Sequence, residues 1–245
     1  MIRCQPWLGT LVEITAAGAD AISAGFAAIA AVHAAMNVHD ANSELSIANR
    51  IASASPIVLS HALAAVVARG LFWSRLSDGA FDAAGGDWRR VHLDGRALRL
   101  ASGVQLDLSG IAKGFAVDRA IHALRRSGCR AGLVNAGGDM RGFGAAPWCV
   151  TLVRPERTPL AQVQLRNRAL ATSAAHPGGS LAHLPGHHPG LVSVSVEARR
   201  AIDADALAKI VIAGSPHAVR CLAAVGARAL TLDADGTVAE VGARR

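Results

Sequence analysis

Asp107-Leu-Ser-Gly-Ile-Ala-Lys-Gly-Phe-Ala-Val-Asp118 is the most informative segment of this 245-residue chain. The pattern predicts that a strand ends at its first residue, that the chain then turns, and that a helix follows over residues 109–127. A helix start presents free N–H groups and a positive dipole, which suit a phosphate, and Gly110 and Gly114 would let a ligand approach closely. Lys113 lies in the first turn, where a cation opposes the dipole, so we favour a role in holding an anion. An ordinary strand-turn-helix with an exposed lysine is the alternative.

A second segment, Val134-Asn-Ala-Gly-Gly-Asp139, places two polar side chains after a buried strand predicted over residues 131–135. Clefts at strand ends are common ligand sites in α/β folds, which would make Asn135 and Asp139 binding residues. A tight turn, which Asn and Gly favour, explains the same residues without any ligand.

A third segment, Ile202-Asp-Ala-Asp-Ala-Leu-Ala-Lys209, begins a helix predicted over residues 202–213. Asp203 and Asp205 suit the positive end of the helix dipole. Metal coordination is the more specific alternative. Asp205 and Lys209 are four residues apart, so they share one face of the helix.

Strands and helices alternate irregularly along the chain, which indicates an α+β or mixed α/β architecture. Residues 9–15 predict a strand, and residues 19–36 predict a helix with apolar side chains at helical spacing. Ser43 and Ser60 are expected to cap helices, and two short strands are expected within residues 96–108. No repeat or linker divides the sequence, so residues 1–245 are expected to form a single compact unit.

Composition excludes several classes of protein. Hydrophobic residues make up 51% of the chain and charged residues 18%, which excludes intrinsic disorder. No uncharged apolar run reaches the ~18 residues of a membrane span, and residues 1–10 lack the apolar core of a signal peptide. We therefore expect a cytoplasmic protein without a membrane anchor. The net charge of +7 comes from scattered arginines, so no nucleic acid is expected as a partner. An RNA-binding domain is a weaker alternative that charge alone suggests.

The cysteines and histidines give little indication of a zinc site. The four cysteines are far apart and form no C-x-x-C pair. Four histidines fall in or beside a loop predicted over residues 177–190, but no Cys or acid joins them at the usual zinc spacing. These are His176, His183, His187 and His188. A solvated loop is the favoured interpretation.

Seven blocks of the sequence together carry a family resemblance. The two central blocks are DLSGIAKGFAVDRA (107–120) and VNAGGDMRGFG (134–144), and the others are GTLVEIT, NSELSIANR, DGAFDAAGG, LATSA and DADALAKIVIAG. Taken in their order along the chain, these seven blocks resemble the ApbE-like FAD:protein FMN transferases, and the resemblance covers essentially the whole chain. The resemblance implies an ApbE-like α+β fold with mixed sheets flanked by helices. It also implies transfer of FMN from FAD to a Thr or Ser hydroxyl of a target flavoprotein, with release of AMP and the help of a divalent cation, usually Mg²⁺.

The resemblance and the segments above assign roles to individual residues. The residues expected to bind FAD are Leu8, where the family usually has Met, Ala80, Phe81 and Asp82 on the flavin side, and Asp107, Lys113, Asn135 and Asp139. The metal would be held by the Gly110 carbonyl and by Asp205, with residue 209 beside them. His183 is the candidate base, and Lys113 is the second candidate catalytic residue.

Three departures from the family pattern bear on activity. Lys209 stands where the family has a Thr metal ligand, and a protonated ammonium cannot ligate a metal, so Lys209 would replace part of the cation or abolish metal binding. The family's His-Ile-Ile-(Asp/Asn)-Pro motif is missing. In its place stands the loop AHLPGHHPGLVSVSV (182–196), in which His183, His187 or His188 would be the base. The flavin-side segment is shortened to FDAAGGDW.

Two functions therefore remain open. The first is an active FMN transferase that acts on a flavoprotein. The second is a non-catalytic relative that binds FAD, or another adenine dinucleotide, as a carrier or regulator. Lys209 and the shortened histidine loop favour the second, whereas the intact segment around Lys113 favours the first.

Overall fold

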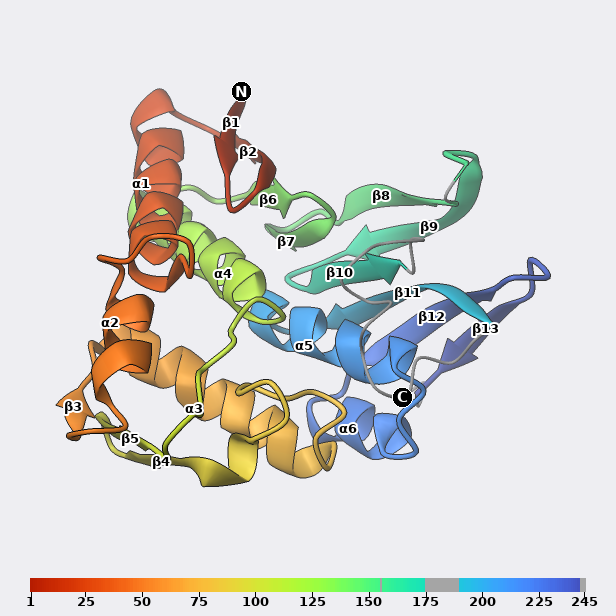
Figure 1. The fold of residues 1–245 in the computed structure, drawn as a ribbon. Coiled ribbons are helices and arrows are strands. Elements are labelled where there is room, and N and C mark those ends of the chain that lie inside the picture. The colour runs from red at the N-terminus through yellow and green to blue at the C-terminus, as the bar shows by residue number, and fades with distance from the viewer. Residues whose placement is uncertain (155, 175–189, 243–245) are drawn as a thin grey trace.

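An eight-stranded antiparallel sheet forms one side of the molecule (Figure 1). The computed structural model describes residues 1–154, 156–174 and 190–242. The sheet has the order β1-β2-β6-β7-β10-β11-β12-β13. Its strands are β1 (Ile2–Trp7), β2 (Thr10–Ala16), β6 (Gly132–Ala136), β7 (Asp139–Phe143), β10 (Ala169–Ala174), β11 (Leu191–Ala198), β12 (Arg228–Asp233) and β13 (Val238–Val241). Helices and antiparallel strands are thus combined in one fold, and the α+β class is confirmed.

Helices cover one face of this sheet in two layers. Helix α4 (Ala112–Arg126) packs on β6 and β7, and α5 (Ala201–Ile212) packs on β10 and β11. Helix α1 (Ala19–Met36) packs on α4 and contacts α3 (His61–Leu76), so α1 and α3 form the outer layer (Figure 1). The remaining helices are α2 (Glu44–Ile51), α6 (Ala218–Ala224) and the 3-10 turn Trp88–Arg90.

Two small sheets complete the fold. One consists of β3 (Ile57–Val58), β5 (Ala97–Leu100) and β4 (Val91–Asp94). The other is the hairpin β8 (Trp148–Val153) and β9 (Pro159–Leu165), which contacts β7. Met140 and Leu170 of the large sheet join Leu152 and Leu165 of this hairpin in an apolar cluster. Because side chains alternate across a strand, Asp139 and Arg141 point to the opposite, helix-covered face.

Helix α1 is a core helix with unusual apolar length. Its Ile22, Phe26, Ile29 and Val32 are buried, as their helical spacing predicts. The helix also meets the length and composition of a membrane span, with a mean hydropathy of 1.5. The helix includes the charged Asp20, so it does not contradict the expectation that no uncharged apolar run reaches this length. The helix packs against α4 and β2, which is how a core helix of a globular fold is placed.

The segment before α4 differs from its prediction. Only β5 forms within residues 96–108, and no strand ends at Asp107. Val104, Leu106 and Leu108 are buried in alternation, which gives the sequence the period of a strand. The backbone of Leu106 is instead satisfied by the Asn49 carboxamide, which accepts from its N–H at 2.7 Å and donates to its carbonyl at 3.0 Å. A side chain has therefore taken the place of a neighbouring strand.

Candidate functional site

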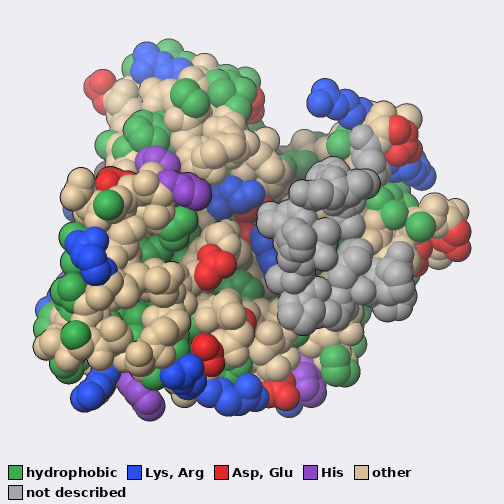
Figure 2. Space-filling view, viewed as in Figure 1, with side chains coloured by type: hydrophobic (Ala, Val, Ile, Leu, Met, Phe, Trp, Pro, Cys, Tyr) green, Lys and Arg blue, Asp and Glu red, His purple; other side chains and the backbone are tan. Residues whose placement is uncertain are grey.

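A cleft of about 670 Å³ opens where the start of α4 meets the β6–β7 turn and strands β8, β10 and β11. On the face shown in Figure 2, basic and acidic side chains lie together in a hollow near the middle, while other Lys and Arg side chains are dispersed around it. The cleft brings together seven of the residues expected to bind ligand or metal. They are Ala80, Phe81, Asp82, Asp107, Gly110, Lys113 and Lys209.

Lys113 is in the first turn of α4, as predicted, and forms an ion pair with Asp139. Its Nζ lies 3.1 Å from Asp139 Oδ2, and Asp139 is 0% exposed. Among the described residues the other oxygen of Asp139, Oδ1, has no hydrogen-bond partner. Burial and the nearby Asp205 carboxylate raise the pKa of Asp139 to about 7, against the opposing effect of Lys113 and Lys209. Asp139 therefore lies beneath the cleft wall and acts on the cleft through Lys113.

Lys209 and Asp205 form a second pair on one face of α5. Lys209 Nζ donates to Asp205 Oδ1, and the backbone N–H of Gly114 donates to Asp205 Oδ2 at 2.9 Å. Burial lowers the pKa of Lys209, but the carboxylates of Asp205 and Asp139 raise it by more, so the net pKa lies above its ordinary value. Lys209 is therefore a protonated ammonium at neutral pH.

The two glycines of the central motif make room for protein rather than for a ligand. A Cβ at Gly114 would lie 2.3 Å from the carbonyl oxygen of Ala201 and 2.9 Å from Cβ of Asp205. A Cβ at Gly110 would lie 2.9 Å from the Phe81 ring. The close approach predicted at Gly114 thus belongs to helix α5, and the one at Gly110 belongs to the Phe81 side chain.

Some expected binding residues lie outside the cleft lining. Asn135 accepts a hydrogen bond from the Gly138 N–H at 3.0 Å, so its carboxamide stabilises the β6–β7 turn, as the alternative interpretation holds. Leu8 has a φ of +56° in the β1–β2 turn and packs against the core. His183 lies outside the described residues, so its role as base stays a prediction.

A magnesium ion does not fit the residues described here. Mg²⁺ requires near-octahedral coordination by oxygen ligands, and both oxygens of Asp205 already accept bonds from N–H donors. The ammonium of Lys209 has no lone pair to offer. Among the described residues no group of three or more His, Cys, Asp or Glu side chains could hold a metal. Of the expected ligands, the Gly110 carbonyl alone remains.

Residues that sequence reasoning did not select also line the cleft. They are Ser109, Gly137, Gly138, Met140, residues 150–153, residues 172–174 and Ser195. Thr172 and Ser195 share a hydrogen bond of 2.8 Å between their hydroxyls across β10 and β11. Thr172 lies in the LATSA block, so the family resemblance already pointed to this part of the cleft. No motif in strand β8 indicated a binding role, because its contribution to the cleft depends on how the β8–β9 hairpin folds over the sheet.

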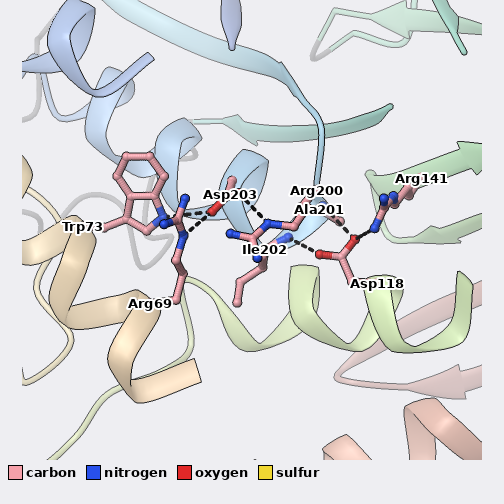
Figure 3. Close-up of polar contacts among 8 residues, drawn as sticks. All are labelled: Arg69, Trp73, Asp118, Arg141, Arg200, Ala201, Ile202 and Asp203. Carbon is pink, nitrogen blue, oxygen red and sulfur yellow. Dashed lines mark hydrogen bonds and ion pairs between the residues drawn. The ribbon is translucent and has the colours of Figure 1, made fainter. Parts of the chain in front are cut away.

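A polar network behind the cleft fixes the position of α5 (Figure 3). Asp118 of α4 accepts from the backbone N–H groups of Ala201 and Ile202 at 3.0 and 3.1 Å, which caps the start of α5. Arg141 also donates to Asp118, at 2.6 Å. Asp118 thus anchors the helix that carries Asp205 and Lys209.

Asp203 makes the other half of this network. It accepts from Arg69 at 2.6 Å and from Trp73 at 3.3 Å, both on α3, and from Arg200 at 2.9 Å (Figure 3). The helix-dipole interpretation of Asp203 is therefore incomplete, because the carboxylate is buried in specific contacts.

Comparison with known proteins decides the family. The ApbE family model matches residues 8–87 and 83–178, which include both central motifs. The chain belongs to the ApbE family. An FAD:protein FMN transferase of Treponema pallidum (strain Nichols) is 29% identical over 231 residues, which cover 68% of this chain and 64% of that relative. The match thus spans less than two thirds of the relative's own length.

Solved ApbE structures share the fold. The ApbE protein of Thermotoga maritima superposes with a TM-score of 0.87 at 22% identity, covering 98% of this chain and 96% of that chain. The flavin transferase ApbE of Vibrio cholerae gives 0.85 at 20% identity, with coverage of 98% and 96%. The flavinyl transferase ApbE of Pseudomonas stutzeri gives 0.84 at 19% identity, with coverage of 98% and 94%. The expected ApbE-like fold is confirmed.

Proposed function

We propose that this ApbE-family chain is an FAD:protein FMN transferase, which moves FMN from FAD to a Thr or Ser hydroxyl of an acceptor flavoprotein and releases AMP. The observation that carries the proposal is that one cleft combines two lysine ammonium groups with residues 80–82, which match the flavin side of the family. The name of the Treponema pallidum relative supports the same activity.

The size and charge of the cleft suit a dinucleotide. Cofactor sites are usually clefts of roughly 300–1,000 Å³, and this one has about 670 Å³. Lys113 and Lys209 stand together on its wall, where they would face the diphosphate. Apolar residues such as Phe81 and Met140 line other parts of the cleft, and these would contact the rings.

The reaction needs charge stabilisation and a base. The acceptor hydroxyl oxygen forms a bond to the phosphorus of the FMN half, the bond from that phosphorus to the AMP oxygen breaks, and the hydroxyl proton passes to a base. Negative charge grows on the departing AMP, and fixed cations at that point lower the barrier. We assign this stabilisation to Lys113 and Lys209, and the base to His183. No step of the proposal runs through a metal.

A carrier or regulator that binds FAD, or another adenine dinucleotide, without turnover is the second candidate. The observation that favours it is Lys209, which replaces the Thr that the family resemblance leads us to expect and makes an ion pair with Asp205.

The test is product formation. The purified chain is incubated with FAD and a peptide that carries a flavinylation-type Thr, and released AMP is compared with FMN attached to the peptide by mass spectrometry. Equal amounts of both products support the transferase. If FAD binds but neither product forms, the chain is a carrier or regulator and not a transferase. A Thr→Ala peptide is the matched control, and AMP release with that peptide would indicate FAD hydrolysis instead of transfer.

A further inference from the structure

Lys209 presents its charge to the cleft while it is held from behind. Lys209 is in the last turn of α5, and its Nζ binds Asp205 one turn earlier. The Lys209 side chain is 20% exposed and lines the cleft, whereas Asp205 is 0% exposed. The ammonium therefore lies between a buried carboxylate and the space where a ligand would bind.

Each oxygen of Asp205 accepts one hydrogen bond, and one of the two donors is the ammonium of Lys209. The second oxygen of Asp205 accepts from the Gly114 N–H, one of the amides at the start of α4 that have no partner within their own helix. Asp205 thus satisfies a helix end from a neighbouring helix. A cation that bound Asp205 Oδ1 would lie beside the ammonium of Lys209, which would repel it unless the Lys209 side chain moved away.

The two lysines of the cleft wall can donate hydrogen bonds to a diphosphate. Two lysines, Lys113 and Lys209, and two carboxylates, Asp82 and Asp107, line the cleft. Each ammonium has three N–H donors, and each forms an ion pair with a carboxylate behind it. The remaining donors can meet the two negative charges of a diphosphate. A divalent cation in the same place would be repelled by two ammonium groups.

We propose that the Lys209 ammonium is a built-in counter-ion for the diphosphate of the bound dinucleotide, so that this chain binds FAD without a divalent metal. The proposal rests on the proposed function, because it concerns the same cleft. The proposed function concerns the reaction, whereas the counter-ion role concerns which group neutralises the diphosphate of bound FAD.

The first test needs no variant. The affinity of the full chain for FAD is measured by flavin fluorescence in EDTA and again with excess Mg²⁺. We expect the two dissociation constants to agree within about twofold, whereas a gain of about tenfold or more with Mg²⁺ would overturn the proposal.

Two substitutions at one position separate charge from metal ligation. Lys209→Met keeps the length of the side chain but has neither a charge nor a ligand oxygen, so FAD affinity should fall at least about tenfold with or without Mg²⁺. Lys209→Thr supplies a ligand oxygen, so its affinity should fall in EDTA and recover with Mg²⁺. Wild-type affinity of Lys209→Met in EDTA would contradict the proposal. Thermal unfolding checks that each variant is folded.

Metal binding alone gives a readout that does not depend on FAD. Electron paramagnetic resonance of Mn²⁺ should show no saturable binding to the wild-type chain and saturable binding to Lys209→Thr. Saturable Mn²⁺ binding by the wild type that Asp205→Asn abolishes would overturn the proposal, even if the Lys209 variants fail to fold.

The outcomes also separate this inference from the proposed function. Metal-independent FAD binding without FMN transfer would contradict the proposed transferase activity and support Lys209 as the counter-ion. FMN transfer by a wild-type chain whose FAD binding requires Mg²⁺ would support the transferase activity and contradict the counter-ion role of Lys209.

Discussion

Helices α4 and α5 are tied to each other and to their neighbours by buried carboxylates at both ends of their shared contact, and the two ends satisfy those carboxylates differently. At the end far from the cleft, Asp118 accepts from a guanidinium and two backbone amides, and Asp203 accepts from two guanidiniums and an indole. At the cleft end, within the part of the chain that the structure describes, Asp139 forms an ion pair with Lys113 only, and Asp205 accepts from Lys209 and one amide.

The difference separates a structural network from a binding surface. Carboxylates that accept three hydrogen bonds each from groups on neighbouring elements fix the helices in place. Ammonium groups held by a single carboxylate keep donors for a ligand. We infer that the far end supports the fold and that the cleft end binds the substrate, and substitutions at each end should affect different measurements.

The largest expected effect is at the far end. Asp118→Ala should lower the free energy of unfolding by about 3–5 kcal/mol, because it breaks a buried ion pair and uncaps α5. Chemical denaturation measures this change. Asp87→Ala removes an exposed pair with Arg90 and should cost at most about 1 kcal/mol. Equal losses of unfolding free energy in the two variants would show that Asp118 stabilises the fold no more than an exposed ion pair does. FAD affinity of folded Asp118→Ala should remain close to wild type.

Gly114→Ala should come next. The added methyl would meet a backbone carbonyl of α5 at 2.3 Å, so the helices must separate, at a cost of about 3 kcal/mol. Gly25→Ala on α1 is the matched control, since its methyl meets the flexible end of Ile14 at 2.9 Å and helix propensity returns up to about 1 kcal/mol. If both variants unfold at the same denaturant concentration, the packing argument at Gly114 is wrong.

At the cleft end, Lys113→Met should weaken FAD binding by about 1.5–3 kcal/mol, the usual value of a hydrogen bond to a charged group. Its stability should change less than its affinity, because the pKa of Asp139 is already about 7 and this carboxyl can take up a proton. Titration calorimetry and denaturation measure the two effects. Arg89→Met, which removes an exposed cation outside the cleft, should leave FAD affinity unchanged. An affinity loss of the same size there would indicate a general charge effect.

A pH dependence of stability is expected from Asp139. Its pKa is 3.8 in an unfolded chain and about 7 here, because burial and Asp205 oppose ionisation more than Lys113 and Lys209 favour it. Between these two values the folded state keeps a proton that the unfolded state has released. The free energy of unfolding should therefore fall as pH rises from about 4 to 7, by up to about 1.4 kcal/mol per pH unit.

Asp139→Asn has no proton to lose at this position, so it should lack this component of the pH dependence. Denaturation curves of both proteins across the pH range provide the comparison. Parallel stability profiles for wild type and variant would rule out the raised pKa.

Local features of the fold could be predicted because their causes are local. Ser43 and Ser60 cap α2 and α3 as predicted, since a cap needs only a hydroxyl three residues before an N–H group. Helical spacing placed Lys113 in the first turn of α4. The same spacing placed Asp205 and Lys209 on one face of α5.

Strands were less predictable than helices. Sequence reasoning does not predict β10 or β7 as strands. Strand β10 pairs with β7 and β11, which are distant in the sequence, whereas β7 pairs with its hairpin neighbour β6 as well as with β10. Residues 104–108 had the alternation of a strand but no neighbouring strand to pair with, and the Asn49 side chain took that place. Pairing partners are a property of the folded chain, so periodicity alone could not decide either case.

The sequence by itself determined the family resemblance, the α+β class and the residue types that we propose to meet a phosphate. Only the tertiary structure decided that Asp139 lies buried beneath Lys113, that Gly114 makes room for α5, and that both oxygens of Asp205 are occupied. The physical reason is that burial and hydrogen bonding depend on distant parts of the chain, as in the bond between Gly114 and Asp205, which are 91 residues apart, and no local pattern records such neighbours.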